Sequence, residues 1–87
     1  MTLFGIKTTM KFEWDEQKRL INLQRHGFDF VGVSEVFDDP NALTVLDDRF
    51  DYGEIRFITF GSLNGRVVSV IHTETDKIIR IISARKA

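Results

Sequence analysis

Apolar and polar residues alternate most clearly in the second half of the chain, where the pattern predicts four strands. The expected strands are residues 43–46, 54–62, 66–74 and 77–86. The last of them, KIIRIISARK, has apolar residues at both alternating positions. This is typical of a strand whose two faces are both covered.

The first half of the chain predicts one short strand and two helices. Residues 11–14 alternate polar and apolar, which indicates an edge strand. Asp15 is a good N-cap and Gly27 a good C-terminal cap for a first helix, and Asp29 caps a second helix that ends before Pro40. The residues expected on the buried side of the first helix are Leu20, Ile21 and Leu23. The order β-α-α-β-β-β-β predicts an α+β fold with a mostly antiparallel sheet and the helix pair on one of its faces.

The dipeptide Asn64-Gly65 sets the expected pairing of the two longest strands, because it is typical of a two-residue hairpin turn. Such a turn pairs Leu63 with Arg66. Continuing the same register places Phe57 opposite His72.

A tight turn at Thr75-Asp76 would then place His72 opposite Ile79 and Ile71 opposite Arg80. One sheet face would hold Phe57, Val70, His72, Ile79 and Ile81. The other face would hold Arg56, Ile58, Phe60, Ile71, Ile78, Arg80 and Ile82. Because two helices can cover only one face, the second face should leave a large apolar patch. We therefore expect a homodimer, or dependence on a partner protein for solubility.

The composition fits one domain with no bound cofactor. We expect residues 1–9 to be an extension or disordered arm and residues 10–87 to be the single domain. The chain contains no Cys and only two His, far apart, so neither a disulfide nor a metal site is expected. There is no signal peptide and no apolar run long enough to span a membrane, which favours the cytoplasm.

Charge is distributed unevenly along the chain, although its formal net value is only −1. Residues 1–48 contain five Lys and Arg against nine Asp and Glu, whereas residues 49–87 contain seven against four. The strand half is therefore cationic, which favours a polyanionic ligand on that half.

The candidate chemistry lies on these strands and on the loop of residues 47–56. Arg80, inside an apolar strand, could meet a phosphate or form a salt bridge with a carboxylate such as Glu54. His72 could be a general acid–base or a packed strand histidine. The loop aromatics Phe50 and Tyr52 could pack in the core or stack against an unpaired base. A His, several Arg and a loop Tyr on one sheet would meet the needs of metal-free RNA cleavage, namely proton transfer and stabilisation of a pentavalent phosphate.

Several motifs closely resemble the BrnT family of bacterial toxins. They are FEWDEQKRLINLQRHGFDF, EVFDDP, DYGEIRFITFG, VIHTE and RIISARKA, in unbroken order from Lys11 to Ala87. The resemblance implies a RelE-like fold and an endoribonuclease of a type II toxin–antitoxin pair. It also implies a ribbon-helix-helix antitoxin, which would contact operator DNA when the complex represses its own operon. Family members continue into a charged C-terminal helix, whereas this sequence ends at Ala87.

Taken with the resemblance, the residues predict metal-independent RNA cleavage in which the 2′-OH is the nucleophile. The expected catalytic residues are His72 as acid–base, with Arg80 and Arg56 as phosphate ligands. The expected RNA-binding residues are Arg49, Tyr52, Arg85 and Lys86. The alternative is a non-catalytic module whose sheet only binds a DNA-binding partner protein.

Overall fold

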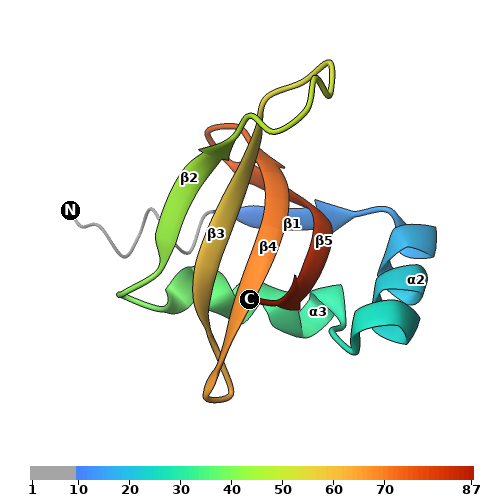
Figure 1. The fold of residues 1–87 in the computed structure, drawn as a ribbon, viewed down its shortest axis with the longest axis vertical. Helices are drawn as coiled ribbons and strands as arrows, with labels where there is room; N and C mark the ends of the chain where they lie inside the picture. Colours follow the sequence, from blue (N-terminus) through green and yellow to red (C-terminus); the bar gives the residue numbers. More distant parts are fainter. Residues whose placement is uncertain (1–9) are drawn as a thin grey trace.

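The structure is a computed structural model that describes residues 10–87, so the arm predicted for residues 1–9 lies outside the described residues (Figure 1). It is an α+β fold built on one five-stranded mixed sheet. The strands are β1 (Lys11–Trp14), β2 (Leu43–Asp47), β3 (Arg56–Leu63), β4 (Arg66–Glu74) and β5 (Ile78–Lys86). Their order in the sheet is β1-β5-β4-β3-β2, with β1 parallel to β5 and all other neighbours antiparallel.

The helical segment between β1 and β2 begins and ends at the caps that the sequence predicts. Helix α2 (Glu16–His26) starts after Asp15, whose side chain accepts a hydrogen bond from the Lys18 N–H, and stops at Gly27 in the left-handed conformation. After Asp29, helix α3 (Phe30–Val33) makes one turn and then tightens into the 3-10 helix η1 (Ser34–Asp38). The second predicted helix is therefore short and irregular.

The hydrophobic core lies between the sheet and the segment formed by α3 and η1, which crosses one face of the sheet (Figure 1). The buried apolar side chains are Phe28, Phe30, Val33 and Val36 from the helical segment, and Val68, Val70, Ile79, Ile81 and Ala84 from the strands. We call the opposite face of the sheet the outer face.

Helix α2 is attached to the sheet in a way that the sequence did not predict. Its expected buried side is wrong, since Leu20 and Ile21 are 52% and 53% exposed, and Leu23 is exposed as well. The buried residue is Asn22, whose amide bonds the backbone N–H and C=O of Ala84 at 3.0 and 2.9 Å and the C=O of Phe28 at 2.9 Å. Because β1 ends at Trp14, Ala84 has no strand partner on that side, and the Asn22 side chain takes the strand's place.

The hairpin register is confirmed from Leu63–Arg66 to Phe57–His72. The register expected between β4 and β5 is wrong by two residues at His72 and by three at Ile71, which pairs with Ser83 rather than Arg80. The connection is longer than a two-residue turn and is closed by a hydrogen bond from the Thr75 N–H to the Ile78 C=O. His72 therefore pairs with Ile81, and a bulge follows. A shift of two residues leaves Ile79, Arg80 and Ile81 on their expected faces, whereas beyond the bulge Ala84 pairs with the buried Val70.

The apolar side chains of the outer face are less exposed than the sequence suggested. Ile58, Phe60, Ile71, Ile78 and Ile82 are all half-buried. The exposed large apolar side chains lie instead mainly on α2, on β2 and in the loop after β2. The predicted homodimer stays a prediction.

Gly61 on β3 permits the close approach of η1. A Cβ added at this position would lie 2.7 Å from Val36 Cγ1 and 2.9 Å from the Val36 carbonyl oxygen. We expect Gly61→Ala to lower the free energy of unfolding by about 1–3 kcal/mol, because the backbone of η1 must shift. Denaturant unfolding measures this change.

Gly32 in α3 is the matched control, since a Cβ there meets nothing within 4 Å. Gly32→Ala should leave stability unchanged or raise it by up to about 1 kcal/mol, because alanine favours the helical conformation. Equal effects of the two substitutions would contradict the close contact between η1 and β3.

Candidate functional site

Three arginines predicted for the site form one connected polar network with two carboxylates and a tyrosine. Arg56 and Arg80 share the carboxylate of Glu54, at 2.9 Å from Arg56 Nε and 2.7 Å from Arg80 Nη2. Arg56 also lies over the ring of Tyr52, with its guanidinium carbon 4.2 Å from the ring centroid. Tyr52 in turn donates a hydrogen bond to Asp47, at 2.9 Å. The network therefore joins β3, β5 and the loop after β2.

Glu54 is the carboxylate at the centre of the arginine pair. The hydrogen bond from Arg56, together with the nearby charge of Arg80, lowers the pKa of Glu54 from its ordinary value. The salt-bridge alternative for Arg80 therefore describes the geometry seen here. Arg80 is still 43% exposed at its side chain, and its second hydrogen bond, from Nε to Thr73 Oγ1, is long at 3.4 Å. Its guanidinium is thus open to an incoming anion.

Asp47 holds the second part of the network and is fully buried at its side chain. Arg49 donates to it twice, from Nε at 2.7 Å and from Nη2 at 3.0 Å. These hydrogen bonds, with smaller help from Tyr52, keep the pKa of Asp47 well below its usual range. A permanently ionised, buried carboxylate fixes Arg49 and Tyr52 in one orientation.

The Tyr52 ring is in contact with two neighbouring side chains, Arg56 and Phe50. Its ring is covered by Arg56, and Phe50 meets it edge-on with centroids 5.8 Å apart. Burial and the hydrogen bond to Asp47 raise its pKa. Phe50, which is 68% exposed, leaves more ring surface open to a ligand than Tyr52 does.

Arg85 extends the cationic surface across the outer face. It is exposed and lines a shallow hollow with Arg49, Ser69 and three apolar side chains, Ile58, Phe60 and Ile71. Lys86, one residue further, pairs with the buried Val68 and so belongs to the other face of the sheet. The structure thus brings Arg85 near Arg49 but does not bring Lys86 to the same surface.

His72 lies apart from the arginines, in the core beneath η1. It is 1% exposed, with Nε2 2.7 Å from Thr59 Oγ1 and its ring edge-on to Phe37 at 4.9 Å between centroids. Nδ1 forms no hydrogen bond of standard geometry with any residue from 10 to 87. Burial lowers the pKa of His72 to about 4. The ring is therefore neutral at pH 7, and its surroundings are those of a packed core residue.

Sequence reasoning missed Asp47, the residue that organises the loop. The run DDRFDYG contains three aspartates, and nothing in the pattern shows which of them turns inward. The one signal in the sequence was strand alternation. In the structure Asp47 is the last residue of β2 and pairs with Arg56, so its side chain points to the outer face.

The fold and this surface define a small α+β domain with an arginine-rich sheet face suited to phosphate groups. Within residues 10–87, no three His, Cys, Asp or Glu side chains are grouped so that they could share a metal ion. No helix in the same range is long and apolar enough to cross a membrane.

Comparison with models of known protein families identifies the family of this domain. Residues 14–87 match the model of the family described as the ribonuclease toxin BrnT of type II toxin–antitoxin systems, and the chain belongs to this family. No curated protein matches the chain.

Proposed function

We propose that this protein is an endoribonuclease toxin whose outer face binds and cleaves RNA. Membership of a ribonuclease toxin family supports the activity. The observation that supports the location is the pair of Arg56 and Arg80 bonded to Glu54, with Arg56 over the Tyr52 ring, on the sheet face that α3 and η1 leave open. Arg49 and Arg85 flank this cluster and would hold the neighbouring phosphates.

In the proposed mechanism a backbone phosphate displaces Glu54 from the two guanidinium groups. Arg80 and Arg56 then bind the phosphate oxygens, and their charge offsets the negative charge that develops in the pentavalent transition state. Arg49, fixed by Asp47, orients the strand, and an unpaired base stacks on the aromatic side chains of the loop.

Glu54 is the residue that we propose as proton acceptor for the attacking 2′-OH. Its pKa is low only while Arg56 and Arg80 bond to it, so the arrival of a phosphate raises its basicity where a base is needed. The 2′-oxygen then attacks phosphorus, and the 5′-oxygen leaves with a proton from solvent. The acid–base role predicted for His72 stays a prediction that its buried position does not favour.

This mechanism predicts the products and the metal requirement of the reaction. Cleavage should persist in excess EDTA, because arginines rather than a metal ion stabilise the phosphate. The products should end in 2′,3′-cyclic phosphate or 3′-phosphate, with a 5′-OH on the downstream fragment. Mass spectrometry of a cleaved oligonucleotide measures these ends, and Arg80→Ala protein purified in parallel detects contaminating nuclease. Activity that is lost with chelator and restored by magnesium would exclude the mechanism.

The cellular part of the proposal is a toxin–antitoxin pair in the cytoplasm. The antitoxin would be a ribbon-helix-helix protein that neutralises the toxin, and the complex would repress its own operon. Induced expression of this chain should arrest growth, and co-expression of the antitoxin should relieve the arrest. A well-folded protein that causes no arrest would favour the non-catalytic binding module.

A further inference from the structure

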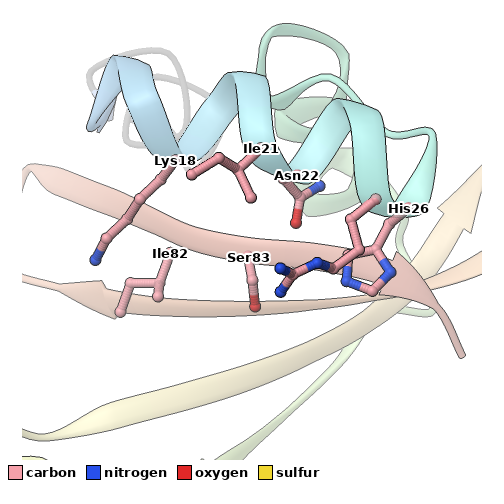
Figure 2. Close-up of a pocket in the computed structure, with 7 residues that line it drawn as sticks. Lys18, Ile21, Asn22, His26, Ile82 and Ser83 are labelled. Carbon is pink, nitrogen blue, oxygen red and sulfur yellow. The ribbon is translucent and has the colours of Figure 1, made fainter.

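A groove between α2 and β5 lies outside the network described above (Figure 2). Its lining residues are Lys18, Ile21, Asn22, Arg25, His26, Ile82 and Ser83. The figure shows side chains of α2 and β5 approaching each other across the gap, with Ile21 above and Ile82 below. Ile21 is 53% exposed, so the groove has an apolar centre open to solvent.

The cations around this groove differ from the three arginines of the polar network. Arg49, Arg56 and Arg80 each bond a carboxylate, whereas the side chains of Lys18 and Arg25 form no ion pair or hydrogen bond with any residue from 10 to 87. No Asp or Glu lines the groove. The groove therefore combines an apolar centre with unneutralised positive charge at its rim.

The groove is not suited to the addition of a further strand to β5. Both backbone groups of Ala84 that point toward α2 are already hydrogen-bonded by the Asn22 side chain. A ligand here must be recognised mainly by its side chains. An amphipathic segment fits this requirement, because apolar side chains can seat against Ile21 and Ile82 while acidic ones reach Lys18 and Arg25.

We propose that this groove is the docking site for a segment of the antitoxin with interspersed apolar and acidic side chains. The inference rests on the protein partner in the proposed function but not on the cleavage mechanism. We favour a protein over RNA because the centre of the groove is aliphatic, formed by Ile21 and Ile82. Ile21, the exposed apolar residue of α2 that lines the groove, then becomes a contact residue.

The test compares groove variants in binding to the purified cognate antitoxin, measured by calorimetry at low and high salt. Ile21→Glu should weaken binding by about tenfold or more, because it places a carboxylate in the apolar centre. The double variant Lys18→Glu/Arg25→Glu should weaken binding at low salt most strongly, since screening reduces the charge contribution. Val31→Glu, at a 60% exposed residue of α3 outside the groove, is the matched control and should bind normally.

RNA cleavage by the free variants separates the partner from the substrate. The Ile21→Glu protein should cleave RNA as the parent does while escaping neutralisation. Normal antitoxin affinity in both groove variants would overturn the proposal. If the same variants also lost RNA cleavage, the groove would be identified as an RNA-binding site. If the parent protein cleaves no RNA, the affinities still decide the docking site, so the two proposals fail independently.

Discussion

Arg80→Ala should reduce the rate of RNA cleavage by about 10²–10³ and abolish toxicity, while the protein stays folded. An electrostatic donor aimed at a transition state contributes roughly this much when it is removed. In the free protein the Arg80 guanidinium bonds Glu54 and Thr73 at a partly exposed position. Removing the Arg80 side chain should therefore cost little stability. Cleavage kinetics and circular dichroism measure the two effects.

Two further variants make the Arg80 result specific. Arg80→Lys should restore little activity, because an ammonium cannot bind phosphate through two parallel hydrogen bonds. Arg66→Ala is the matched control, since Arg66 lies over Phe28, away from the Glu54 network, with its guanidinium carbon 5.1 Å from the ring. It should cleave RNA normally. An Arg80→Ala protein that is inactive because it is unfolded would instead support a purely structural salt bridge.

Acidification from pH 7 to pH 5 should lower the free energy of unfolding by about 2 kcal/mol through His72 alone. Burial holds the pKa of His72 at about 4 in the folded protein, against an ordinary value of 6.5. The unfolded chain therefore binds the proton first, and stability is lost as the pH falls from 6.5 toward 4. Carboxylates with a lowered pKa, such as Asp47 and Glu54, act mostly at lower pH.

Replacing His72 isolates this effect. His72→Gln should flatten the dependence of stability on pH between 7 and 5, whatever its cost at neutral pH. The parent protein in the same buffers gives the reference slope. Denaturant unfolding at several pH values gives both slopes. A parent protein that is equally stable at pH 5 and pH 7 would show that His72 is accessible to protons in the folded state.

The parts of the fold that the sequence predicted correctly are those fixed by local backbone chemistry. Asn64 and Gly65 both adopt positive φ, 52° and 79°, and this turn sets the β3–β4 register. The connection from β4 to β5 has no comparable signal. It depends on a side chain, since Thr75 Oγ1 accepts a hydrogen bond from the Ile78 N–H, and its length was misjudged.

The errors about α2 and about the site have a common physical origin, because both depend on contacts between distant segments. The amphipathic pattern of α2 suggested an apolar interface, but the helix is anchored by Asn22 to a strand 62 residues away. Strand alternation already placed His72 and Arg80 on opposite faces. It could not show that α3 and η1 would cover the histidine and leave the arginine open.

The pairing of β1 with β5 has a consequence for the time at which the protein becomes folded. Strand β1 pairs with residues 78–81 of β5. The core beneath α3 also contains Ile79, Ile81 and Ala84 from β5. During synthesis, the first half of the chain therefore cannot fold until β5 has been made, because β1 and the core both depend on pairing with this distant strand. Arg80 enters the sheet in the same step. Folding and assembly of the arginine cluster should thus be coupled, so that a nascent chain lacking β5 can neither fold nor cut RNA.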